Sequence, residues 1–233
     1  MPNNHLCARE AQGSTARSAL IETTELRWFR NGPLPRSVCS WFTSNGAFGA
    51  VEERDDRYLM DGRLDRGLKL RGGSTLELKV RQTIDHTVPS SDGPDAVVEL
   101  PRGTVEEWQK WSPADHLVST GSEPWVEVHK RIVKRRFTIA GEEMTVLDHA
   151  DTPVGVYCDI EIVVIDDGSA EGWSLAFAAH GPLPSRLAGI GAAWGALVSV
   201  SRPPSRSLVF DVSCGYPEWL ERRIGDSSAV TGR

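Results

Sequence analysis

The chain has 233 residues and a formal net charge of −6, from 26 Lys and Arg against 32 Asp and Glu. This acidic balance argues against a general nucleic-acid or anionic-membrane surface, because either would need a basic excess. The length suits one large β-rich domain or two small ones, and no linker divides the chain. We therefore predict one domain over residues 20–225, with disordered tails at 1–19 and 226–233.

The cysteines and the apolar runs indicate where the protein resides. Cys7, Cys39, Cys158 and Cys214 are scattered without a C-x-x-C pair, which is typical of reduced thiols rather than disulfides or a zinc site. The longest apolar stretch, residues 187–200, contains three glycines and has the length of a buried helix rather than a membrane span. No hydrophobic leader opens the chain. We expect a cytoplasmic protein without a membrane partner, and the sequence leaves the oligomeric state open.

The first third of the chain predicts strands around one helix. Residues 21–30 alternate and predict a strand, with Glu25 and Arg27 on the face opposite Leu26 and Trp28. Helical spacing of apolar residues predicts a short helix over 36–44. Residues 51–60 then predict a second strand.

A β-hairpin is predicted at residues 67–82. Leucines alternate with charged residues on both sides of a Gly-Gly turn, which is the usual hairpin pattern. Five charged side chains therefore project from one face of this ribbon: Lys69, Arg71, Glu77, Lys79 and Arg81.

The remainder predicts further strands and three helices. A capping box, Thr104-x-x-Glu107, predicts a helix with Val105, Trp108 and Trp111 on one side as core anchors. Further strands are expected at 96–100, 125–139 (with a bulge), 144–149, 156–165, 173–180 and 207–213, and helices at 185–198 and 216–224.

The charged faces of these strands allow two interpretations. One is an antiparallel sheet with one face in water, the usual position of charged faces. The other is an antiparallel β-barrel with helices outside and charges inside. The cations occur in like-charged pairs (Lys69 with Arg71, Lys79 with Arg81, Lys134 with Arg136), and amphipathic helices are available to cover the apolar faces. We therefore predict an α+β barrel, whose charged interior requires a polyanionic ligand, an acidic counter-cluster, or both.

Strand 21–30, the hairpin LKLR-GG-LELK, the strand IVKRRF and the strand CDIEI occur in this order. Together they resemble the CYTH or triphosphate tunnel metalloenzyme superfamily, over about residues 21–165. That family includes thiamine triphosphatases, tripolyphosphatases and class IV adenylyl cyclases. The resemblance implies an eight-stranded tunnel that binds a triphosphate through inward Arg and Lys, with Mg²⁺ or Mn²⁺ held by acidic residues.

The resemblance also implies roles for particular residues. Asp56-x-Tyr58 is similar to the family's D-x-Y. Phosphate contacts are implied for Lys69, Arg71, Lys79, Arg81, Lys134 and Arg136. Catalytic roles are implied for Glu25, Arg27 and Lys79, and metal binding for Glu25, Asp159 and Glu161.

The chain departs from the family at its first strand. The family's E-x-E-x-K is replaced by Thr23, Glu25 and Arg27, and loss of a carboxylate weakens a site for a hard cation. Glu77 or Glu127 could supply that carboxylate, although a counter-ion role is favoured for both. His129 could act as an acid or base, although a structural role is favoured.

Three functions follow from these observations. The first is metal-dependent hydrolysis of a triphosphate, by phosphoryl transfer to water. The second is a non-catalytic tunnel or interaction domain that binds a phosphate-rich small molecule. The third is a carrier or interaction domain whose charged face is simply exposed to water.

Overall fold

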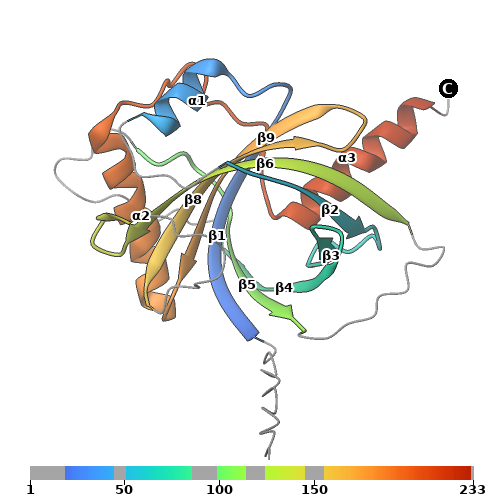
Figure 1. The fold of residues 1–233 in the computed structure, drawn as a ribbon, viewed down its shortest axis with the longest axis horizontal. Helices are drawn as coiled ribbons and strands as arrows, with labels where there is room; N and C mark the ends of the chain where they lie inside the picture. Colours follow the sequence, from blue (N-terminus) through green and yellow to red (C-terminus); the bar gives the residue numbers. More distant parts are fainter. Residues whose placement is uncertain (1–18, 45–50, 86–98, 114–123, 145–154, 232–233) are drawn as a thin grey trace, which may run out of the picture.

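Eight antiparallel strands form a closed β-barrel in the computed structural model of the protein, which describes residues 19–44, 51–85, 99–113, 124–144 and 155–231 (Figure 1). The strand order is β1-β5-β4-β3-β2-β6-β8-β9, and β9 pairs with β1 to close the ring. The predicted α+β antiparallel barrel is therefore confirmed. The strands are β1 (Ala19–Asn31), β2 (Glu52–Leu59), β3 (Arg66–Arg71), β4 (Thr75–Asp85), β5 (Val105–Ser112), β6 (Trp125–Thr138), β8 (Tyr157–Asp166) and β9 (Glu171–His180). Two short strands lie off the ring, β7 (Glu143–Met144) beside β6 and β10 (Val212–Ser213) beside β1.

The outer face of the barrel carries the main hydrophobic core. Leu26 and Trp28 of β1 point outward because they alternate with Glu25 and Arg27. They join the buried cluster that α1 (Arg36–Thr43) and α2 (Leu183–Val200) cover from outside. Each fully buried large apolar side chain contributes about 1.5–3 kcal/mol relative to exposure. The predicted helices at 36–44 and 185–198 are confirmed by α1 and α2.

One end of the barrel is closed by the start of α3 (Tyr216–Thr231), seen at the right of Figure 1. Trp219 stacks on Phe29 with ring centroids 4.5 Å apart, and Tyr216 stacks on Tyr58 at 5.1 Å. Gly215 makes this approach possible, since a Cβ there would lie 2.6 Å from Trp108 Cζ2. Aromatic side chains therefore cover this end of the barrel.

The helix predicted from the capping box is wrong. Residues 105–112 form β5, which pairs with β1 on one side and β4 on the other. Trp108 points into the barrel, whereas Trp111 lies on the outer face and is 40% exposed. A local capping pattern was overridden by pairing with two distant strands, which the ring needs in order to close.

Other boundaries were predicted less accurately. β6 keeps one register along its full pairing with β2 and with β8, so the expected bulge is absent there. The strand expected at 207–213 is reduced to Val212 and Ser213. Of the strand expected at 96–100, residues 99–100 are not in a strand and residues 96–98 lie outside the described residues. Residues 145–149 of the strand expected at 144–149 also lie outside the described residues.

Helix α2 is long and apolar enough to cross a membrane by length and composition alone, a test that core helices of soluble proteins also pass. It packs on the barrel through Ile190, Ala193, Trp194 and Leu197, which are all buried. The helix predicted as buried is therefore buried along one face, with a third of its residues buried in all.

Candidate functional site

The interior of the barrel is lined by charged side chains. The strand registers place ten cations and seven carboxylates on the inner face, so positive charge is in excess. The cations are Arg27, Arg54, Lys69, Arg71, Lys79, Arg81, Lys110, Lys130, Lys134 and Arg136. The carboxylates are Glu25, Glu52, Asp56, Glu77, Glu106, Asp159 and Glu161. We refer to these seventeen residues as the charged lining.

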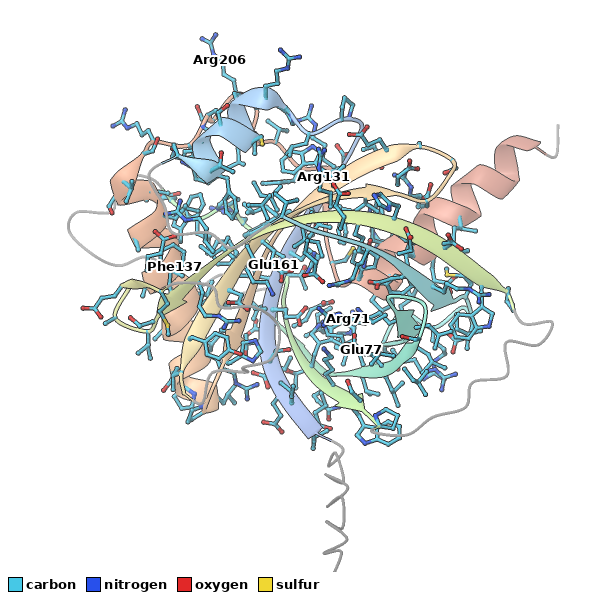
Figure 2. All side chains as sticks on the ribbon, in the orientation of Figure 1. Arg71, Glu77, Arg131, Phe137, Glu161 and Arg206 are labelled. Carbon is cyan, nitrogen blue, oxygen red and sulfur yellow. The ribbon has the colours of Figure 1, made fainter. Side chains whose placement is uncertain are left out.

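The hairpin wall of the lining is organised around Glu77. Its carboxylate lies 2.9 Å from Lys69 Nζ, 2.7 Å from Lys110 Nζ and 3.5 Å from Arg71 Nη1. Burial alone would raise the pKa of Glu77, but Lys69 and Lys110 hold it well below its ordinary value. Three cations therefore share one carboxylate, and Arg71 and Lys110 remain 31% and 27% exposed. Figure 2 shows Arg71 and Glu77 within the ring of strands.

The opposite wall comes from β6 and β8. Arg136 forms a bidentate pair with Asp159 at 2.6 and 2.9 Å, and Lys134 Nζ lies 3.0 Å from Glu161. Burial would raise the pKa of Glu161, but Lys134 and Arg27 lower it well below its ordinary range. Lys134 and Glu161 stay partly exposed inside the barrel, where Figure 2 labels Glu161.

Glu25 of β1 stands between these walls. It accepts hydrogen bonds from Lys79 Nζ at 2.6 and 2.5 Å, and from Thr23 Oγ1 at 3.0 Å. Burial opposes ionisation, but Lys79 and Arg27 lower the pKa of Glu25 overall. Thr23 therefore supports Glu25 as a hydrogen-bond donor and does not add a second carboxylate.

Toward the closed end, the central carboxylate is covered. Asp56 is fully buried and pairs with Lys130 at 2.9 Å, Arg54 at 3.1 Å and Lys69 at 3.5 Å. Burial would raise the pKa of Asp56, but these three cations, Lys130 foremost, hold it well below its ordinary value. Lys130 Nζ lies 4.0 Å from the centre of the Tyr216 ring of α3, a cation–π contact. Lys130 and Asp56 are therefore part of the folded core.

A second buried pair joins the barrel to α3. Arg81 Nη1 lies 2.6 Å from Glu106 and 3.3 Å from Glu218 of α3. The Trp108 indole donates to Glu106 at 3.1 Å. Burial raises the pKa of Glu106 above its ordinary value despite Arg81. Arg81 thus links α3 to the barrel through Glu218.

The structure brings all the sequence-predicted site residues to the inner face. Glu25, Arg27, Lys69, Arg71, Lys79, Arg81, Lys134, Arg136, Asp159 and Glu161 all belong to the charged lining. Asp56 and Tyr58 also face inward. Glu127 and His129 lie on the exposed outer face of β6, and His129 pairs there with Asp55 at 2.8 Å. The proposals of an inward carboxylate at 127 and an acid or base at 129 are therefore wrong, because the unbroken register of β6 turns both residues outward.

Sequence reasoning missed part of the lining. Arg54 lies two residues before Asp56, so both face the same side of β2. Lys130 faces the same side as Lys134 because β6 has no bulge. Alternation along each strand could therefore have placed both cations on the inner face. Lys110 and Glu106 were missed because a helix was predicted where β5 lies. His180 ends β9 and had no signal, because its neighbours on the inner face are alanines and a serine.

The carboxylates do not form a preassembled metal site. Among the residues that the structure describes, no three His, Cys, Asp or Glu side chains are grouped closely enough to hold an ion. The predicted ligands Glu25, Asp159 and Glu161 direct their oxygens to Lys79, Arg136 and Lys134 instead. The donor set in this arrangement therefore does not fit Mg²⁺ or Mn²⁺, and metal binding stays a prediction.

Fold and lining together define a closed antiparallel β-barrel with a cationic interior, in which Arg71, Lys110, Lys79 and Lys134 are 24–31% exposed. Comparison with known proteins adds no family assignment, since no protein-family model and no curated protein matches the chain.

Proposed function

We propose that the barrel binds a phosphate-rich small anion at its open end, as a divergent relative of the triphosphate tunnel proteins. The observation that carries the proposal is the surplus of cations on the inner face, ten against seven carboxylates. Solvated faces usually mix the two signs evenly, and a low-dielectric cavity with surplus positive charge attracts anions strongly.

The exposed members of the lining support this position for the ligand. Arg71, Lys110, Lys79 and Lys134 are 24–31% exposed, whereas Lys130 is 5% exposed under α3. Arg and Lys donors that already lie side by side lose little entropy on binding phosphate oxygens, and Arg71 and Arg136 offer planar forks that match them. A cation that contacts a phosphate oxygen gives up part of its contact with a carboxylate of the lining. The net affinity therefore depends on the excess of cations over carboxylates.

Calorimetric titration of the protein with tripolyphosphate at low and high salt tests the proposal. We expect binding that weakens by at least tenfold between about 0.05 M and about 0.5 M salt, because screening reduces long-range attraction. Lys134→Gln should weaken binding about tenfold, a loss of about 1.4 kcal/mol.

The matched control lies on the same strand. Arg131 belongs to β6 but points outward and is exposed, so Arg131→Gln removes one positive charge from the outer face instead of the inner face. We expect no change in affinity beyond about twofold for this variant. Equal loss in both variants, or no heat of binding in the wild type, would overturn the proposal.

Metal-dependent hydrolysis of the bound anion is the second candidate. It rests on the resemblance to the tunnel family, and on Glu25 of β1 facing Asp159 and Glu161 of β8 across the small residues of β9; in the free protein these carboxylates pair with cations instead of forming a metal site. Phosphate release from tripolyphosphate, ATP and thiamine triphosphate with Mg²⁺ or Mn²⁺ would select this candidate if Glu161→Gln abolishes it. Binding without phosphate release would select the non-catalytic tunnel or interaction domain.

A further inference from the structure

Strand β9 interrupts the charged lining with small side chains. Its inner face carries Ser174, Ala176, Ala178 and then His180, with no charged side chain. On either side, Arg27 of β1 and Glu161 of β8 flank Ala176, and Glu25 and Asp159 flank Ala178. Ala178 and His180 are partly exposed, whereas Ser174 and Ala176 are buried. This strip of small side chains runs between charged walls, from the buried Ser174, which accepts a hydrogen bond from Arg27 Nη1 at 3.0 Å, to the partly exposed Ala178 and His180.

His180 stands at the partly exposed end of this strip. Its imidazole stacks on Tyr157 with ring centroids 4.4 Å apart and planes 14° apart. The Arg136 guanidinium lies over the Tyr157 ring at 4.3 Å. The stack orients the His180 ring, and in the described part of the chain no side chain or backbone group hydrogen-bonds to its nitrogens.

The charges that face His180 have both signs. Glu25 comes from β1, Asp159 from β8, and Lys134 and Arg136 from β6, while Thr23 and Tyr157 are its neutral neighbours in register. Burial lowers the pKa of His180, against the opposing effect of the two carboxylates. The lowered pKa favours the neutral imidazole in the free protein, a form that keeps one acceptor nitrogen.

We propose that His180 is a direct contact of the bound anion, and that the anion binds together with a proton taken up from solvent by the imidazole. This inference rests on the proposed function of the barrel. The proton adds to the free ring nitrogen, no other bond changes, and the imidazolium then donates an N–H to a phosphate oxygen. The positive charge that results adds to Arg136 and Lys134 only when an anion is present to compensate it.

Linkage gives the proposal a measurable consequence. A bound polyanion stabilises the imidazolium, so ligand affinity must rise as pH falls, by at most about tenfold per pH unit. The rise is confined to the range between the His180 pKa of the free protein and that of the complex. Up to about one proton is taken up per ligand within that range.

Calorimetry with tripolyphosphate in buffers of different ionisation enthalpy measures this proton uptake directly. For the wild type near pH 7 we expect an uptake of a sizeable fraction of one proton. His180→Gln should still bind, with uptake by the protein greatly reduced and a flatter affinity between about pH 6 and about pH 8. His129→Gln is the matched control, because His129 lies on the outer face and pairs with Asp55.

The outcomes separate this inference from the proposed function. If the wild type does not bind, the anion-binding proposal fails and this inference fails with it. If the wild type binds but takes up no proton, or if His180→Gln takes up the same fraction, only the role of His180 is overturned. A histidine ring-proton NMR titration of the wild type needs no variant: the His180 pKa should rise when tripolyphosphate is added, and an unchanged value would contradict the inference.

Discussion

The two ends of the barrel use similar side chains for different purposes. At the closed end, Asp56 holds Lys130 beneath aromatic rings that include Tyr216, and the two side chains are 0% and 5% exposed. At the open end, three cations share Glu77 and stay partly exposed. A buried charge without its partner is strongly destabilising, whereas a partly exposed surplus charge is tolerated and can bind a ligand. The difference shows that burial separates charges enclosed in the core from charges that stay accessible to solvent on one continuous inner face.

Removal of the closing helix contact should have the largest effect. Trp219→Ala leaves a large cavity against Phe29, and we expect a loss of about 3–5 kcal/mol in the free energy of unfolding. Urea denaturation followed by fluorescence measures it. The control Trp111→Ala, at a 40% exposed outer position, should cost less than about 1 kcal/mol. A similar loss in both variants would contradict a structural closed end.

Removal of the buried Asp56 carboxylate should have the second largest effect on stability. Asp56→Ala leaves Lys130 without its carboxylate in the core, and we expect a loss of about 3 kcal/mol in unfolding free energy. Asp55→Ala is the neighbouring control, since its pair with His129 is on the exposed face and should contribute about 0–1 kcal/mol. Chemical denaturation of both variants compares the two faces of β2. A larger loss for Asp55 would mean that the assigned faces are reversed.

Acidification should destabilise the fold through the same carboxylates. The pKa values of Asp56, Glu77 and Glu161 are depressed in the folded state, so their stabilisation is complete above the unfolded pKa of about 4. It is lost as pH falls from there through the folded values. We expect a loss of about 1 kcal/mol at pH 4, and a steeper loss below, in unfolding curves across pH. In Asp56→Ala the slope below pH 4 should be shallower, and an unchanged slope would exclude Asp56 as a contributor.

Removal of the Glu77 charge at the open end should have the smallest effect. Unlike the changes above, it should strengthen ligand binding. Glu77→Gln removes the negative charge that Lys69, Arg71 and Lys110 share. We expect tripolyphosphate to bind more tightly by about 1 kcal/mol, roughly fivefold. The matched control, Glu107→Gln, changes the outer face of β5 and should leave affinity unchanged. Weaker binding in Glu77→Gln would mean that the surplus cations at the mouth do not hold the ligand.

Particular residues show how far the sequence predicts this architecture. The alternation of Lys69 and Arg71 with Leu68 and Leu70 assigned faces correctly, and a turn of two glycines with positive φ, 57° and 76°, closes the hairpin as expected. The same alternation assigned Glu25, Asp159 and Glu161 to one side of their strands. It did not identify β5, where the inner face is charged and the outer face is also partly polar, so no amphipathic contrast marked a strand.

The sequence by itself therefore determined which side chains share a face along each strand, because side-chain direction in a strand depends only on local backbone geometry. The tertiary structure alone decided whether the charged faces look into water or into a closed ring, since that depends on β9 pairing with β1 across about 150 residues. It also decided which carboxylate neutralises which cation, and placed His180 beside Tyr157. Such contacts join residues far apart in sequence, and no local pattern encodes them.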